Sequence, residues 1–277
     1  MPFAYQLPIF FVFIPVIFGV IIYLFKKPWI TSLSFLAQIT LFIAFFVYHQ
    51  FWLTNPEHHL IVFGGWSERI GISFYADSLN LTFTLLSIVI FSIVLLYLFQ
   101  FRRKDHKFLF FFLFLEGVFL GMIQTNDLFN MFVFLELVTV IVTVLISYQK
   151  TGPSFQAGIY YLLLNTVGAL FFLIGIIFLY NTFGTINILL LKDLIPLQGD
   201  RTVVQFAYII MISGISVKAA LFPLFTWLPK AHGVAQSGIS ALLSGLVVKG
   251  ALYVFIRLNR YMYVNVPLQL RDRKSVV

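Results

Sequence analysis

Two lysines lie inside otherwise apolar stretches of this chain, at positions where an amine can bind and release protons. They are Lys218 and Lys249, and a hydrophilic turn with Lys230 and His232 separates them. Ionisable side chains at membrane depth are rare and usually functional. The segment 214–249 therefore predicts an ion pathway. Within it His232 is either a proton relay that titrates near neutral pH or an interfacial residue.

A proline interrupts the first of these stretches. Pro223 lies five residues after Lys218, so it cannot donate a hydrogen bond to the carbonyl of Ala219, and its ring clashes there. The helix should therefore kink or break beside the lysine. Broken helices at membrane depth persist only where protein or a water-filled cavity satisfies the freed backbone groups.

The second stretch carries small residues at helical spacing. Gly238, Ala241, Gly245 and Lys249 lie on one face of a predicted helix. Small residues allow a neighbouring helix to approach closely. We therefore expect this face to contact another helix.

Glutamates in two apolar stretches are candidates for the same chemistry. Glu136 is followed at helical spacing by Thr139, Thr143 and Ser147. These hydroxyls either form a proton path or bond to their own backbone carbonyls. Glu116 is either a proton carrier or a protonated residue that holds helices together.

The composition identifies an integral membrane protein. Hydrophobic residues make up 61% and charged residues 10% of the chain, and the mean hydropathy is +0.99. The 35 phenylalanines require an outer surface that faces lipid. The chain has no cysteine, which excludes disulfides and thiolate metal sites. His58 and His59 match no metal-ligand spacing, so no metal site is predicted.

The net charge of +8 does not indicate nucleic-acid binding, because the cations gather in short loops, as they do on the cytoplasmic side of membrane proteins. A span needs about 20 apolar residues. By this measure we predict an all-α polytopic bundle of about eight transmembrane helices, the seventh of them broken. The spans are 3–25, 30–53, 78–101, 108–125, 128–148, 155–180, 205–228 and 237–258.

The basic loops predict the orientation. Lysines and arginines follow the first, third, fifth and seventh spans, which places these loops in the cytoplasm and the N-terminus outside. Arginines and a lysine after the eighth span disagree with this rule, because they fall on the outer side: Arg257, Arg260, Arg271, Arg273 and Lys274.

Three longer stretches carry a family resemblance: GISVKAALFPLFTWLPKAH with the following SGISALLSGLVVKGALYVF, GISFYADSLNL (71–81) and NDLFNMFVFLELVTV (126–140). The chain resembles the antiporter-like membrane subunits. These include the proton-pumping subunits of respiratory complex I, related hydrogenase subunits and the large subunits of Mrp-type sodium/proton antiporters. The LPKAH form is most similar to the D subunits of the Mrp type.

The resemblance implies roles for particular residues. Glu136 matches the glutamate of the fifth span, Lys218 the lysine of the broken seventh span and Lys249 the lysine of the eighth, all facing the interior of a five-helix repeat. Glu116 falls where some members have a glutamate. The implied function is that of a membrane subunit in a sodium/proton antiporter, moving protons along a buried Glu/Lys chain. It implies no cofactor and no enzymatic activity, and as partners it implies other antiporter subunits in a cell membrane.

Two other interpretations follow from the same residues. The chain is alternatively a proton-pumping subunit of a complex I-like oxidoreductase or a membrane-bound hydrogenase. The family pattern has about fourteen spans, and the polar residues 268–277 differ from the next loop of that pattern. A third interpretation is therefore an inactive truncated fragment, with 1–267 as the antiporter-like domain and 268–277 as a tail foreign to the family.

Overall fold

The computed structural model describes residues 6–27, 29–55, 60–69, 71–102, 105–198 and 201–260. The histidines considered for metal binding, His58 and His59, and the tail 268–277 lie outside these ranges. Within them the chain is largely helical. The helices are α1 Leu7–Phe25, α2 Leu33–Thr54, α3 Ser78–Arg102, α4 His106–Gln124, α5 Leu128–Ile146, α6 Gly152–Phe183, α7 Ile188–Gln198, α8 Arg201–Lys218, α9 Trp227–Val234, α10 Ser237–Leu242 and α11 Val248–Leu258.

Shorter elements complete the described part of the chain. A π-helical turn, Leu243–Val247, joins α10 to α11, and 3₁₀ turns occupy Ile30–Ser32 and Ser147–Gln149. Strands β1 (Leu60–Val62) and β2 (Ser73–Tyr75) pair antiparallel.

Seven helical segments in the described ranges are long and apolar enough to cross a membrane. They confirm the predicted polytopic fold, and the chain is a multi-pass membrane protein. They are Leu7–Phe25, Ile30–Thr54, Ser78–Phe101, His106–Gln124, Leu128–Gln149, Gly152–Phe183 and Ser237–Leu258. The remaining predicted span, 205–228, differs, because α8 ends at Lys218 and a separate short helix, α9, follows. Helix α7 was not predicted.

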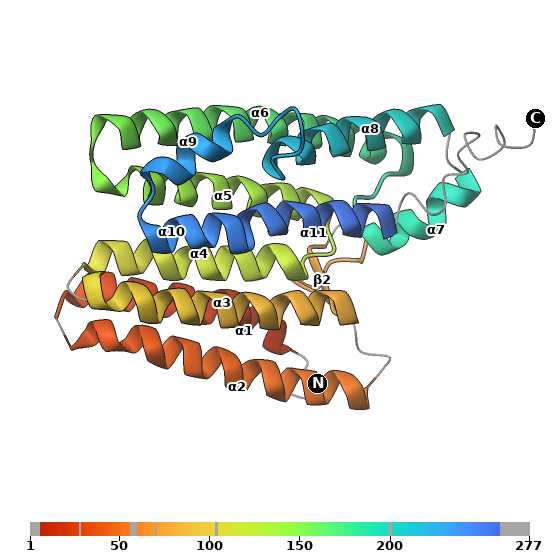
Figure 1. The fold of residues 1–277 in the computed structure, drawn as a ribbon. Coiled ribbons are helices and arrows are strands. Elements are labelled where there is room, and N and C mark those ends of the chain that lie inside the picture. The colour runs from red at the N-terminus through yellow and green to blue at the C-terminus, as the bar shows by residue number, and fades with distance from the viewer. Residues whose placement is uncertain are drawn as a thin grey trace, which may run out of the picture.

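Helices α1 to α6 lie side by side and alternate in direction, α7 lies obliquely at one end, and α8 and α9 run in the same direction (Figure 1). α6 packs extensively on α8 and α1 on α4, with α4, α5 and α10–α11 in the middle of the bundle. The C-terminal ends of α1, α3 and α5 and the turn between α9 and α10 lie at one end of the bundle (Figure 1). The basic loops therefore share one end, as the predicted orientation requires.

The opposite end is closed by polar contacts around the strands. Arg257, which the sequence placed on the unexpected side, is buried, and its guanidinium donates to the Ile123 carbonyl at 2.9 Å. Arg260 pairs with Asp77 at 3.4 Å. Two of the five exceptional cations, Arg257 and Arg260, therefore have partners at this end, and the other three lie outside the described residues.

The broken helix ends in a hydrogen-bonded cap rather than a kink. Ala220 has a left-handed backbone (φ 50°). Its N–H bonds to the Val217 carbonyl at 3.1 Å, and the Leu221 N–H bonds to the Ser216 carbonyl at 3.0 Å. This is a Schellman ending. The predicted break beside Lys218 is confirmed, but Pro223 lies in the turn beyond it and does not itself end the helix.

Candidate functional site

The structure brings Glu136 of α5 and Lys218 of α8 together. The Lys218 ammonium nitrogen, Nζ, lies 3.2 Å from Glu136 Oε1 and 2.7 Å from Thr139 Oγ1. The Lys218 side chain is 5% exposed and that of Glu136 24% exposed. The second carboxylate oxygen of Glu136 accepts a hydrogen bond from Thr166 of α6 at 3.4 Å. Three helices therefore converge on one ion pair.

The break in the helix supplies further negative potential at the lysine. Lys218 is the last residue of α8, so it lies at the end of the helix that carries the negative pole of the helix dipole. Its ammonium also lies 3.5 Å from the Leu135 carbonyl oxygen. Trp227 from α9 donates to the Val217 carbonyl at 2.9 Å, so part of the freed backbone is satisfied by protein. The buried cation is thus stabilised by a carboxylate, a hydroxyl and backbone dipoles.

The hydroxyls that follow Glu136 serve the backbone. Thr139 donates to the Leu135 carbonyl at 2.9 Å and Thr143 donates to the Thr139 carbonyl at 2.8 Å. Ser147 lies 3.5 Å from the Ser154 carbonyl. Of the two alternatives, self-satisfaction of the helix therefore accounts for Thr139 and Thr143. Thr139 has a second use, because its oxygen also accepts from Lys218.

A small cavity adjoins the pair. It has a volume of about 10 Å³, near the lower limit for one water molecule. Its polar lining consists of Thr139, Tyr161, Asn165 and Lys218. Its apolar lining comes from α4, α5, α11 and the π-helical turn. The cavity therefore extends from the lysine toward the centre of the bundle.

Lys249 was expected to face the interior, and here the prediction is wrong: the side chain is exposed. The next residue, Gly250, faces α4 so closely that a Cβ there would lie 2.6 Å from Phe119 and 2.8 Å from Met122. Consecutive helical residues point about 100° apart, so Lys249 turns away from α4. Of the four small-face residues, Gly238 is buried, but Ala241 and Lys249 are exposed.

Glu116 lies in a different part of the bundle. It is fully buried in α4, and its Oε2 lies 2.6 Å from the Gln38 side-chain nitrogen of α2. Ser92 of α3 donates to the Gln38 amide oxygen at 2.8 Å. Glu116 therefore belongs to a second polar cluster, which shares no residue with the ion pair.

His232 lies on α9 beyond the break. Its Nδ1 is 2.6 Å from the Ser240 hydroxyl and its Nε2 is 3.4 Å from the Ser244 hydroxyl. Burial lowers the pKa of this imidazole below its ordinary value of 6.5. The ring thus bridges α9 to α10 and to the π-helical turn that follows it.

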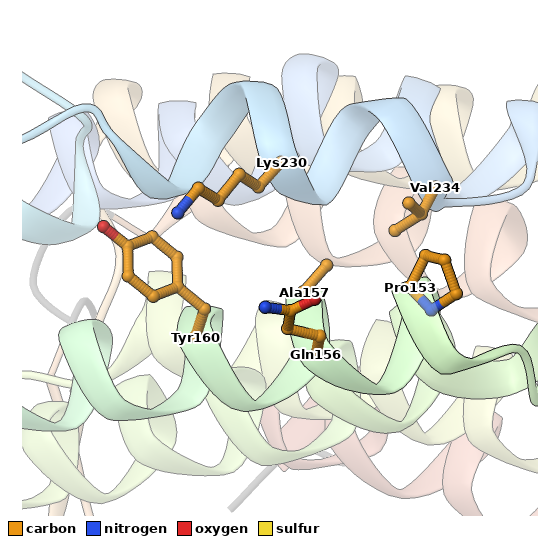
Figure 2. Close-up of a pocket in the computed structure, with 6 residues that line it drawn as sticks. All are labelled: Pro153, Gln156, Ala157, Tyr160, Lys230 and Val234. Carbon is orange, nitrogen blue, oxygen red and sulfur yellow. The ribbon is translucent and has the colours of Figure 1, made fainter.

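A larger cavity opens where α9 crosses the start of α6. It has a volume of about 300 Å³ and lies between two groups of side chains (Figure 2). Lys230 of α9 points toward the ring of Tyr160, with its nitrogen 3.8 Å from the ring centroid. Gln156 of α6 also lines this space. The Lys230 ammonium and the Gln156 amide make this cavity suitable for binding a polar or anionic group.

Several polar residues of these clusters were not identified from the sequence. Gln38 and Ser92 are single uncharged residues in apolar spans, and such residues give no signal of the helix they face. The signal available for Gln38 was an amide within a predicted span. Thr166 also gave no sequence signal of its role, because it follows Asn165 in a helix that is apolar on all sides.

Residues 125–269, more than half of the chain, match the family described as NADH:quinone oxidoreductase/Mrp antiporter, TM. The chain belongs to this family. The matched range contains Glu136, Lys218 and Lys249 but not Glu116. The resemblance inferred from the sequence is therefore confirmed.

Individual relatives extend the comparison. The putative antiporter subunit mnhD2 of Staphylococcus aureus is 37% identical over 200 residues, which covers 70% of this chain and 40% of the relative. A chain of the membrane-bound sulfane sulfur reductase (MBS), an archaeal respiratory membrane complex, is 31% identical with a TM-score of 0.78, and the match covers 92% of this chain and 52% of that one.

A chain of the Mrp complex from Dietzia sp. is 22% identical with a TM-score of 0.75, and the match covers 95% of this chain and 50% of that one. At this identity it shows a shared fold. The family member described here thus spans about half the length of the relatives it matches.

Proposed function

We propose that this chain is a membrane subunit of a multi-subunit monovalent cation/proton antiporter in the cell membrane, with sodium as the cation. Residues 1–267 form its antiporter-like domain. The observation that carries the proposal is the ion pair between Glu136 and the buried Lys218 at a helix break. The 37% identity to a putative antiporter subunit supports the choice of transport class.

The ion pair supplies a way to move protons without covalent chemistry. The Lys218 ammonium and the Glu136 carboxylate form an ion pair at 3.2 Å. A proton that arrives on Glu136 removes this counter-charge, so the buried ammonium loses its strongest partner and releases a proton more readily. The neutral amine can still bond to Thr139. Proton uptake on one side of the pair is thereby coupled to release on the other.

The other candidate residues extend this path. Glu116, Lys249 and His232 are further proton carriers in the proposal. The exposed position of Lys249 suits a path that continues into a neighbouring membrane subunit. The chain itself needs no cofactor for this task and acts as a transporter subunit rather than an enzyme.

A second candidate function is a proton-pumping subunit of a redox-driven membrane complex. It is supported by the 31% identity to a chain of the sulfane sulfur reductase, an archaeal respiratory complex. The same ion pair would serve it, since both functions require a buried proton carrier. The two candidates differ in what drives proton movement.

The test uses inside-out vesicles from the source organism, loaded with a fluorescent ΔpH probe. For an antiporter, sodium chloride should collapse an imposed ΔpH, and Glu136→Gln should abolish the collapse. Potassium chloride serves as the ionic-strength control. Proton pumping that follows an electron donor, is lost in Glu136→Gln and does not respond to sodium would replace the antiporter with the redox function.

A further inference from the structure

In a part of the bundle away from the ion pair, a series of hydrogen bonds connects the three helices α2, α3 and α4. Ser92 of α3 lies 2.8 Å from the Gln38 oxygen, and the Gln38 nitrogen lies 2.6 Å from Glu116 Oε2. Glu116 is 0% exposed and Gln38 is 4% exposed, whereas Ser92 is half-buried. This series of hydrogen bonds therefore runs from a partly accessible hydroxyl to a fully enclosed carboxyl.

The surroundings of Glu116 do not support a negative charge. Within the described part of the chain, its Oε1 has no hydrogen-bond partner, and its Oε2 has the Gln38 amide. Neither ion pair recorded among those residues includes Glu116. A buried carboxylate with one neutral hydrogen bond and no cation is strongly disfavoured against its protonated form. The side chain is therefore a neutral carboxylic acid.

A neutral acid changes how the contact to Gln38 is assigned. The nitrogen and oxygen of an amide are distinguished only by their hydrogen-bond partners. A separation of 2.6 Å is shorter than is usual for N–H···O and lies within the range of O–H···O bonds. Turning the amide over places its oxygen against the Glu116 O–H and its N–H₂ group against Ser92, whose oxygen then accepts.

We propose that Gln38 is a positioning residue that holds Glu116 as a neutral acid, with the acid O–H donated to the amide oxygen and the amide N–H donated to Ser92. The three residues form a second proton-binding site. Loss of the proton would require the amide to turn so that its N–H₂ group faces the carboxylate. The orientation of the Gln38 amide thus depends on whether Glu116 is protonated.

This site rests on the proposed function only for the use of its proton in transport. Its protonation state is a property of the chain alone. The test is therefore spectroscopic and contains no transport step. A failure of sodium/proton exchange leaves the Glu116 site intact, and a failure of the Glu116 site leaves the Glu136–Lys218 proposal intact.

The experiment compares infrared spectra of the full chain in lipid nanodiscs near neutral pH. Subtracting the Glu116→Gln spectrum from that of the parent should reveal a carboxylic-acid C=O band. Glu136→Gln is the matched control, and its difference spectrum should show lost carboxylate bands, because that glutamate is ion-paired. In Gln38→Leu the acid band should remain and move to higher frequency, because its hydrogen bond is gone.

Ser92→Ala gives a second measurement that does not disturb the buried pair directly. It should move the same band in the same direction by a smaller amount, so the test stands even if Gln38→Leu fails to fold. Carboxylate bands in place of the acid band in the Glu116→Gln difference spectrum would overturn the neutral acid. An acid band that neither Gln38→Leu nor Ser92→Ala moves would overturn the role of Gln38.

Discussion

Two glutamates within the helices of this bundle, Glu136 and Glu116, have opposite environments. Glu136 lies beside a lysine, a threonine and the end of a broken helix, and its side chain is 24% exposed. Glu116 lies beside one amide in an unbroken helix and is 0% exposed. The same side chain is therefore suited to a charged form in one place and to a neutral form in the other. The neighbours, rather than the residue type, decide what the carboxyl can do.

The backbone differs between the two places for a related reason. Helix α8 ends at Lys218 in a hydrogen-bonded cap, and a small cavity lies beside this residue. Helix α4 passes Glu116 without interruption and packs closely on α1, where a Cβ on Gly117 would lie 2.6 Å from the Val12 carbonyl. The charged pair thus lies where a helix ends, and the neutral acid lies within a closely packed, uninterrupted helix.

The largest expected effect comes from removing the cation. Lys218→Ala leaves the Glu136 carboxylate without its ion-pair partner, and breaking a buried pair in this way destabilises by about 3–5 kcal/mol. Transport should be abolished. The neutral-acid region should respond less: Gln38→Ala should lower the free energy of unfolding by about 1–3 kcal/mol, the range for a buried group that loses its hydrogen bond.

Denaturant titration of the purified variants in detergent measures both changes, and the double variant Glu136→Gln/Lys218→Met is the control. Removing both charges should recover much of the stability that Lys218→Ala loses, but none of the transport. Equal losses of stability in Lys218→Ala and Gln38→Ala would remove the contrast between the two regions.

The limits of prediction from the sequence follow the same contrast. Glu136 and Lys218 were found because a charge in an apolar span is conspicuous, and the break was found because Pro223 follows the lysine. Gln38 was missed, since an uncharged residue does not indicate which neighbouring helix it faces.

The interior position of Lys249 was implied by the family resemblance and not by the residues around it. In the structure Lys249 shares an exposed side of its segment with Ala241, which precedes the π-helical turn. Helix α7 was missed because its apolar run is too short to read as a span. Positions of spans can therefore be predicted from composition, but the facing of side chains depends on which neighbouring helices pack against each side.

The second prediction separates two roles of the cation. Lys218→Arg keeps a positive charge beside Glu136, but a guanidinium does not give up its proton near neutral pH. If Lys218 relays protons, sodium-dependent ΔpH collapse in vesicles should fall to background although the variant stays folded. Near-normal collapse would instead make the lysine a fixed counter-ion, similar in function to the amide beside Glu116.

The third prediction concerns the helix that carries the lysine. Gly214 of α8 contacts α6 so closely that a Cβ there would overlap the Gly168 carbonyl. Overpacking of this kind costs about 1–3 kcal/mol. Gly214→Ala should therefore push α8 from α6, weaken the Lys218–Glu136 contact and reduce transport in part. Gly233→Ala is the matched control, because nothing lies within 4 Å of a Cβ there, and it should leave transport unchanged.

The smallest expected effect concerns His232, which belongs to neither glutamate region. Burial lowers its pKa below the ordinary 6.5, so between these two values the unfolded chain binds a proton that the folded chain does not. Its contribution to stability is therefore complete above about pH 6.5 and is lost as the pH falls through the folded pKa. The thermal midpoint of the parent should drop by a few degrees at most over this range. His232→Gln, which cannot titrate, should lose that part of the drop. An unchanged pH profile in His232→Gln would assign the acid sensitivity to another group, with Glu136 the first to examine by the same substitution.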